Sequence, residues 1–146
     1  MVPARIRVSS TIENLDSYGL VEGEREETSG VYPGLYEYVG GRVRLEYDES
    51  GEGGNVKTVI GIDGVKMTVE RHGAVESRFE FEEGRVHESV YSVVPYSFDA
   101  TVKARRIRTE CTEDGGRIDL LYNMRIGGQD KAVRMKIWIL LNSSRL

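Results

Sequence analysis

The sequence is poor in the residues that form covalent cross-links and metal clusters. Among its 146 residues it has one cysteine, Cys111, and two histidines, His72 and His87. A single cysteine excludes an internal disulfide and a cysteine metal cluster. Two histidines fifteen residues apart, on different predicted strands, do not have the spacing of a zinc site. We therefore predict no metal and no cofactor, and without a disulfide framework we expect the protein in the cytoplasm.

Long apolar runs and local catalytic motifs are also missing. No segment approaches the ~20 apolar residues of a membrane-spanning helix, and the first residues, M-V-P-A-R-I-R-V, alternate like a strand rather than form an apolar signal region. No serine lies in a G-x-S-x-G motif, and the glycine-rich loop 50–54 has no Lys-Ser/Thr pair after it. Cys111 lies on an apolar stripe, which is typical of an inert buried thiol. We predict no membrane contact and no catalytic residue.

Charge and aromatic content argue against nucleic-acid binding. The formal net charge is −4, and eight tyrosines, three phenylalanines and one tryptophan are few for a base-stacking platform. The charge is unevenly spread, however: residues 1–96 carry 10 Lys/Arg and 18 Asp/Glu, whereas residues 97–146 carry 10 and 6. The asymmetry indicates either a solvated surface whose two halves differ, or a basic face that meets an acidic partner or a second copy of the chain.

What the chain does have is period-two alternation interrupted by glycine turns. In residues 65–69 and 75–81, apolar side chains fall on one face and polar ones on the other, as in a strand with one buried face. Asp-Gly at 63–64 and Glu-Gly at 83–84 suit hairpin turns, which need a residue with positive φ. The same pattern predicts strands at residues 5–12, 28–39, 42–49, 55–62, 65–71, 75–82, 86–93, 97–112, 117–126 and 131–141.

These strands predict an all-β chain. Consecutive strands joined by short turns form an antiparallel meander, and a sheet of many twisted strands tends to close, which removes its edges. We therefore predict that residues 1–146 form a single antiparallel up-and-down barrel of about 8–10 strands, with a two-sheet sandwich as the alternative. At most one or two short helices are expected, within residues 13–21. They would belong to a long connection, residues 13–27, that lies across one mouth of the barrel.

The predicted strand 97–112 changes its alternation halfway. Val102 and Ile107 are both apolar but fall on opposite parities, so a single regular strand cannot bury both. One extra residue in the strand would realign the two halves. We predict a β-bulge at Arg105-Arg106, with both arginines near the surface.

The facing of the predicted strand 86–93 stays open from the sequence. A tight hairpin would pair Phe81 with Val86, which puts Val86 inside the barrel. The alternative register places Tyr91 inside instead, together with the other residues of its parity, His87 and Ser89. Both patterns contain polar residues, so hydrophobicity alone does not decide between them.

Short motifs along nearly the whole chain resemble a known family. They are Gly34-Leu35-Tyr36-Glu37, Gly41-Arg42-Val43, Tyr47-Asp48-Glu49, Arg71-His72-Gly73-Ala74-Val75, Ser77-Arg78-Phe79, Phe81-Glu82-Glu83-Gly84, Tyr91, Pro95-Tyr96 and the G-R-I-D-L-L-Y run at 116–122. In order and spacing they are similar to the YwiB-like family of small bacterial calycin-like β-barrels, whose function is unassigned. The chain departs from that pattern at Ser97, where glycine is usual, and it has no G-x-W motif near its start. The resemblance implies a lipocalin-like barrel, relatives of which often hold small ligands, and it carries over no catalytic residue.

Polar residues on predicted buried faces form the candidate site. Arg71 continues the apolar stripe of residues 65–69, and Ser77 lies between Val75 and Phe79. A guanidinium inside a barrel needs hydrogen bonds and charge compensation. Arg71 therefore either pairs with a carboxylate at the rim or holds the anionic head of a ligand whose tail lies on the apolar wall. The candidate ligand-binding residues are Tyr36, Tyr47, Arg71, Ser77, Tyr91 and Tyr122.

Three functions are compatible with these residues. The first is a non-enzymatic barrel that binds a small amphipathic or anionic ligand. The second is a protein-interaction or assembly module whose barrel is filled by side chains. The third, an enzyme with a carboxylate/arginine site at the mouth, has the least support. The interior volume separates the first two, because a barrel of about eight strands can either be filled or hold one small ligand.

Trp138 is predicted on the outer face of the barrel. It has the parity of Lys136, away from Ile137, and Leu121 and Leu140 are also predicted to point outward. Together these side chains would form an exposed apolar patch. We expect the patch to be covered, either by a second subunit in a homodimer or by the 13–27 segment.

Overall fold

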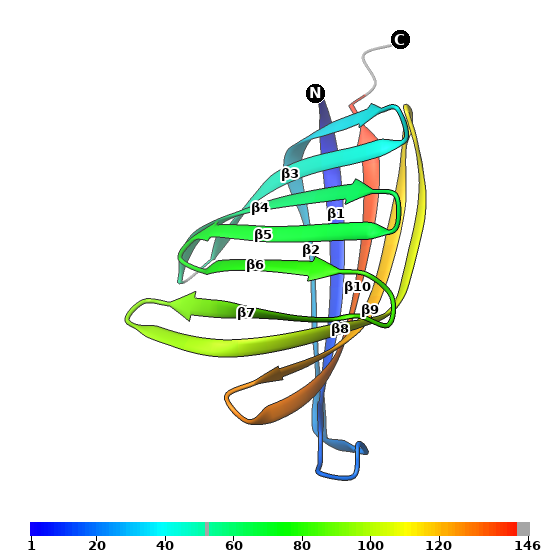
Figure 1. Ribbon diagram of the computed structural model, residues 1–146. Helices are drawn as coiled ribbons and strands as arrows, with labels where there is room; N and C mark the ends of the chain where they lie inside the picture. Colours follow the sequence, from blue (N-terminus) through cyan, green and yellow to red (C-terminus); the bar gives the residue numbers. More distant parts are fainter. Residues whose placement is uncertain (52, 143–146) are drawn as a thin grey trace.

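The computed structural model describes residues 1–51 and 53–142, which form an all-β barrel (Figure 1). The strands are β1 (Val2–Leu15), β2 (Val21–Val39), β3 (Arg42–Gly51), β4 (Gly54–Asp63), β5 (Lys66–Gly73), β6 (Glu76–Phe81), β7 (Val86–Val93), β8 (Tyr96–Thr112), β9 (Gly115–Ile126) and β10 (Gln129–Leu141). Each strand is antiparallel to the next, and β10 pairs with β1 to close the sheet. The predicted antiparallel up-and-down barrel is confirmed, with the upper end of the predicted strand number and with no helix in the described ranges.

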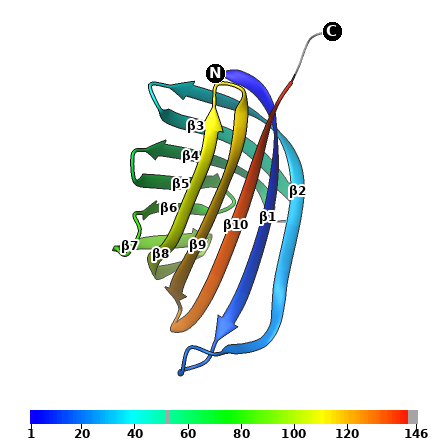
Figure 2. The same cartoon turned by 90° about the vertical axis from the view of Figure 1, so that its right-hand side faces the viewer.

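The alternation of the strands fills most of the barrel interior. Leu45, Ile60 and Leu120 are completely buried, and each aliphatic side chain of this size contributes roughly 1.5–3 kcal/mol when it leaves water. The buried residues on the inward faces of the predicted strands include Val43, Leu45, Met67, Val69, Phe79, Ile118, Leu120 and Val133. Figure 2 shows β8, β9, β10 and β1 running side by side, with the shorter hairpins of β3 to β7 forming the opposite wall.

Strand β8 bends at a bulge. Its register against β9 shifts between Ala104 and Arg106, which confirms the bulge predicted from the change of parity. Arg105 is exposed, as expected. Arg106 is half-buried and its Nε is fully buried, so the prediction that both arginines lie near the surface is correct for Arg105 alone.

The turn between β6 and β7 binds to this bulge. The backbone N–H of Ile107 donates to Glu83 Oε2 at 2.8 Å, and the N–H of Gly84 donates to the carbonyl of Ala104 at 2.9 Å. A bulge leaves backbone groups outside the regular ladder, and the turn supplies partners for two of them. The β6–β7 turn therefore leans toward β8 instead of closing a tight hairpin.

The docked turn decides which side of β7 faces inward. Strand β6 pairs with β7 at two positions, Glu76 with Ser92 and Ser77 with Tyr91, so Phe81 and Val86 are not partners. The half-buried residues of β7 include His87, Ser89 and Tyr91, whereas Val86, Glu88 and Val90 are exposed. The register in which Phe81 pairs with Val86, predicted from hairpin geometry, is therefore wrong. The β6–β7 turn is hydrogen-bonded to the bulge in β8 and does not form a tight hairpin.

Residues 13–27, here called the arm, form a projecting hairpin. Strand β1 continues to Leu15 and β2 begins at Val21, and these two residues are cross-strand partners. Asp16 Oδ1 closes the turn by accepting the backbone N–H groups of Tyr18 and Leu20. Figure 1 shows the arm extending past the end of the barrel, so the expected helical turn across the mouth is wrong. Both faces of the arm are largely in water, which removes the alternation that would have revealed two strands in the sequence.

Candidate functional site

A cavity of about 250 Å³ lies inside the barrel at the end where β1 continues into the arm. Inward-pointing residues of β1, β5, β6, β7, β9 and β10 form its wall, so it is the mouth of the barrel rather than a surface dent. Its lining residues are Ser10, Ile12, Arg71, Phe79, Tyr91, Tyr122, Met124, Ile126, Lys131, Val133 and Met135. The wall is mostly apolar with a few polar groups, which is the composition of a small-molecule site.

A continuous row of polar side chains leads into this cavity. Tyr47 pairs across the strands with Thr58, Thr58 with Arg71, Arg71 with Ser77, and Ser77 with Tyr91. Directly opposite residues on one face of an antiparallel sheet have Cβ atoms roughly 4.5–5.5 Å apart. The row therefore crosses five strands, from β3 to β7, with Arg71 at its centre.

Arg71 has no carboxylate partner in the described parts of the chain. None of the ion pairs formed within residues 1–51 and 53–142 includes its guanidinium. Glu49, an inward-facing acid of β3, instead accepts a hydrogen bond of 3.5 Å from Thr58 Oγ1. The alternative in which Arg71 pairs with a structural carboxylate thus finds no partner among these residues.

A second cation, Lys131, lies on the opposite wall. Its Nζ donates to Asn14 Oδ1 at 3.0 Å, a neutral acceptor that leaves the positive charge uncompensated. Lys131 continues the inward stripe of Val133 and Met135, which is the same signal that identifies Arg71, although it is not among the predicted site residues. The described wall of the cavity therefore holds two cations and no carboxylate.

Tyr122 is the most deeply buried hydroxyl of the wall. Burial raises its pKa, the Arg71 guanidinium lowers it, and Tyr91 raises it again, with burial the strongest cause. Its ring centroid lies 4.7 Å from that of Phe81, which fixes the orientation of the ring. Since the raised pKa keeps the phenol protonated at neutral pH, Tyr122 presents a hydrogen-bond donor.

The structure brings together five of the six predicted site residues. Arg71, Tyr91 and Tyr122 line the cavity, Ser77 is next to Arg71 in the polar row, and Tyr47 lies on the other side of Arg71 beyond Thr58. Tyr36 lies apart: its hydroxyl donates to the carbonyl of Thr112 at 2.7 Å and ties β2 to the end of β8. That these residues bind a ligand stays a prediction.

Two buried hydroxyls of the row have no hydrogen-bond partner among the described residues. They are Tyr47 Oη and Ser77 Oγ. Burial raises the pKa of Tyr47, whereas the nearby Arg71 lowers it and Glu49 raises it. Buried polar atoms without partners are rare and costly in a structural core. Both hydroxyls belong to the same polar row as Arg71.

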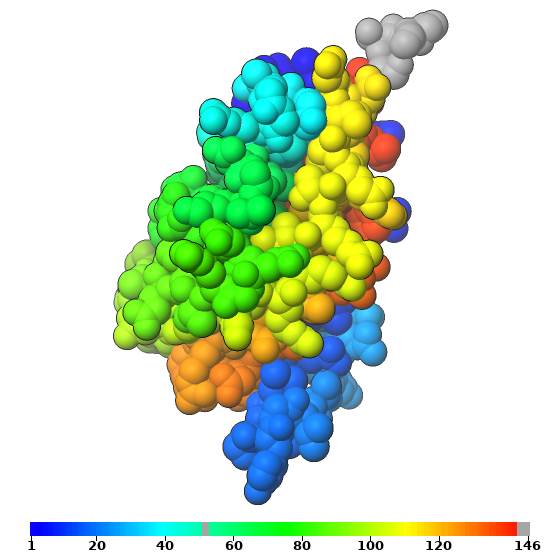
Figure 3. Space-filling model, turned by 45° about the vertical axis from the view of Figure 1, so that its right-hand side comes forward, coloured from blue at the N-terminus to red at the C-terminus, as the bar shows by residue number. Residues whose placement is uncertain are grey.

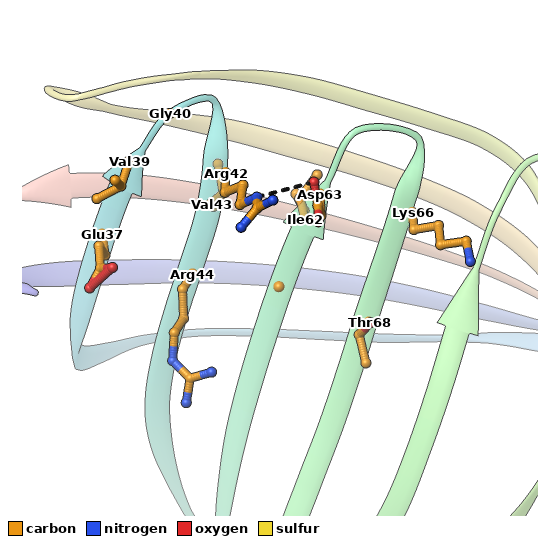
Figure 4. A pocket seen from close by; sticks show the side chains of 11 residues that line it. Glu37, Val39, Gly40, Arg42, Val43, Arg44, Ile62, Asp63, Lys66 and Thr68 are labelled. Atoms are coloured by element: carbon orange, nitrogen blue, oxygen red, sulfur yellow. Dashed lines mark ion pairs between the residues drawn. The ribbon is translucent and has the colours of Figure 1, made fainter.

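A larger hollow, of about 720 Å³, lies on the outer face of β2 to β5 (Figure 4). It exists because Gly61 has no side chain between its cross-strand neighbours Arg44 and Thr68. Arg42 and Asp63 form an ion pair of 3.4 Å at its edge, and charges of both signs alternate around it. Such an open, mixed-charge face is typical of a solvated surface, so the smaller interior cavity is the better candidate.

Metal sites and membrane-spanning helices are both absent from the same described residues. No group of three or more His, Cys, Asp or Glu side chains is arranged to hold a metal ion. No helix in these ranges is long and apolar enough to cross a membrane. Cys111 is half-buried, and burial raises the pKa of its thiol, which lowers its nucleophilicity at neutral pH.

Comparison with known proteins identifies relatives of this barrel. The chain is 26% identical over 129 residues to the uncharacterized beta-barrel protein YwiB of Bacillus subtilis (strain 168), which covers 88% of this chain and 86% of that protein. The crystal structure of YwiB matches it with a TM-score of 0.78 at 24% sequence identity, over 97% of this chain and 93% of the other. The family described as a domain of unknown function (DUF1934) matches residues 14–138. Since this match runs from the arm to Trp138, the chain belongs to the DUF1934 family, and the resemblance found in its motifs is confirmed.

Proposed function

We propose that the protein is a binding protein for a small amphipathic anion, held in the interior cavity between β5 and β10. The observation that carries the proposal is the pair of cations, Arg71 and Lys131, on a wall without a described carboxylate. The molecule as a whole has a net charge of −4, so this local excess of positive charge is not a general property of its surface. A ligand carboxylate would supply the missing negative charge.

The size and lining of the cavity restrict the ligand. Its volume of about 250 Å³ is slightly below the roughly 300–1,000 Å³ of ordinary ligand sites, which favours an aromatic or short-chain acid over a long fatty acid. Met124, Ile126 and Met135 would contact the apolar part, and burial contributes roughly 25 cal/mol per Å² before the cost of association. Arg71 and the Tyr122 hydroxyl would hold the head through charge-assisted hydrogen bonds.

Thermal shift and calorimetry with a matched set of probes test the proposal. Octanoate and 3-phenylpropionate are expected to raise the melting temperature, whereas octanol and octylamine, which lack the carboxylate, are not. Arg71→Met and Lys131→Met should each weaken binding of the acid by about tenfold or more, the loss of one charge-assisted hydrogen bond. Lys66→Met removes an exposed cation from the outer face of β5 and is expected to leave binding unchanged.

The filled part of the barrel favours the second candidate function. Tyr36, Tyr47 and Phe81 are fully buried, and most of the interior holds side chains rather than space. If the wild type binds none of the acids, or if Lys66→Met weakens binding as much as Arg71→Met does, the cavity proposal is wrong. The protein would then be better described as an interaction module whose barrel serves as a scaffold.

A further inference from the structure

The arm is acidic and largely exposed. It contains six acidic residues and a single basic one, Arg25, which lies 3.9 Å from Glu27. At its tip Tyr18 is 88% exposed and Leu20 is 65% exposed. The arm glutamates that form no ion pair within the described residues are Glu13, Glu22, Glu24 and Glu26. The arm thus presents free carboxylates beside exposed apolar side chains. Figure 3 shows the arm projecting below the barrel.

The outer face around Trp138 has the opposite charge. This basic face consists of Arg5, Arg7, Arg108, Arg117, Arg134 and Lys136, which come from β1, β8, β9 and β10. Its two acids are already neutralised, because Glu110 pairs with Arg117 at 3.1 Å and Asp119 with Arg134 at 2.9 Å. The remaining four cations have no carboxylate within 4.0 Å in the parts of the chain that the structure describes.

Trp138 lies at the centre of the basic face. The Arg7 guanidinium is 5.0 Å from the centroid of the indole, and Leu140 beside it is 52% exposed. Residues 13–27 of the same chain do not reach this point: Glu27, the nearest along the strands, pairs with Thr11, which lies opposite Arg134, four residues or about 13 Å from Trp138 along β10. The expectation that this segment covers Trp138 within one chain is therefore wrong.

The arm and the basic face lie on one side of the molecule but at opposite ends. Both include the outer side of β10, β1 and β2: Glu13 and Glu27 lie opposite Ala132 and Thr11 on that side, whereas Glu22 and Glu26 lie opposite Asn14 and Ile12 on the inner side. The arm is at the end of the molecule far from the termini (Figures 1 and 3), and Trp138 is near the C-terminal end of β10. A two-fold axis across these strands, midway between the two features, would place each arm on the other molecule's basic face. Such an isologous contact closes upon itself and uses the same residues twice.

We propose that the protein forms a homodimer in which the acidic arm of each chain docks on the basic face of the other. The arm glutamates pair with the cations that have no carboxylate within their own chain, and Tyr18 and Leu20 cover the apolar surface near Trp138. A second copy fits better than a nucleic acid, because a phosphate backbone would use the cations but leave the exposed apolar side chains without a partner. The dimer is independent of the proposed ligand site.

Charge reversal on each surface tests the dimer. The arm variant is Glu13→Lys/Glu27→Lys, at the two acids on the outer side of the arm, and the face variant is Arg7→Glu/Lys136→Glu. Sedimentation velocity at low salt should show a wild-type dimer, and each variant alone should dissociate at least tenfold more readily, since like charges then meet. An equimolar mixture of the two variants should recover the dimer, because every arm then finds a face of opposite charge.

Matched controls separate this contact from a general charge effect. Asp48→Lys/Glu88→Lys changes two exposed acids outside both surfaces by the same total charge as the arm variant, and it should remain dimeric. Added salt should weaken the wild-type dimer. A monomeric wild type, or a mixture of variants that stays monomeric, overturns the proposal. A monomeric wild type that binds a single-stranded RNA oligonucleotide through the basic face would assign that face to an anionic polymer instead.

Discussion

The two ends of the barrel interior differ in chemistry although the same alternation builds both. Away from the cavity, toward the other end, Leu45, Ile60 and Leu120 are completely buried. At the cavity end Arg71 and Lys131 face each other across a cavity of about 250 Å³. The packed end holds the fold together, whereas the cavity end carries polar groups that contribute little to packing. This difference predicts that the free energy of unfolding and the affinity for a ligand can be changed by substitutions at different residues.

The sharpest test of this comparison is a cavity-creating substitution at each end. Leu120→Ala at the packed end is expected to lower the free energy of unfolding by about 3 kcal/mol, because a fully buried side chain is lost from a site that cannot collapse. Ile126→Ala, on the wall of the existing cavity, should cost about 1 kcal/mol, since less packing is lost there. Urea unfolding measures both values. Equal costs would mean that the two ends do not differ in packing.

The pH dependence of stability tests the boundary between the two ends, where Tyr47 is buried. Its raised pKa, caused first by burial, means that the folded state keeps the phenol protonated when the unfolded chain ionises. The tyrosine therefore supports stability below about pH 10, and this support is lost as the pH rises further. Tyr47→Phe should reduce the fall in unfolding free energy above pH 10 by about 1.4 kcal/mol per pH unit. Tyr18→Phe, at a position 88% exposed, is the control and should change nothing.

The smallest expected effect has the opposite sign. Arg71→Met removes a half-buried cation that has no described carboxylate partner, and methionine can pack against the apolar wall of the cavity. The free energy of unfolding is therefore expected to rise by about 1 kcal/mol, while affinity for the acid probes falls. Urea unfolding without ligand provides the measurement. A loss of stability comparable to that of Leu120→Ala would show that Arg71 is a structural residue and that the two ends are alike.

Local alternation was enough to predict the parts of the fold that depend on one strand at a time. It placed Met67, Val69 and Phe79 inside the barrel and located the bulge at Arg105-Arg106. It identified Arg71 as an inward cation, and Lys131 carried the same signal, although it was not selected. These features follow from the two-residue period of a strand, which the sequence displays directly.

Features that depend on contacts between distant segments were not predictable in this way. The facing of β7 depends on Glu83 reaching the free N–H of Ile107, a contact that no local pattern encodes. The two strands of the arm were not predicted, because a pair of strands exposed to water on both faces shows no alternation of apolar and polar residues. The volume of the cavity depends on how ten strands tilt and close, which is a property of the whole barrel.

The weak joint between β6 and β7 has a kinetic consequence. Two residue pairs and the hydrogen bond from Ser89 Oγ to the carbonyl of Arg78 connect these strands, whereas β8 and β9 pair along twelve positions. Local opening requires a free energy that grows with the number of contacts broken, so this joint is expected to separate far more often than the whole barrel unfolds. Ser77 and Tyr91 form one of the two residue pairs between β6 and β7, and Tyr91 lines the cavity. The rate at which a ligand enters and leaves the cavity would then be set by the local opening of β6 and β7. Amide hydrogen exchange in β7 would report how often these two strands separate.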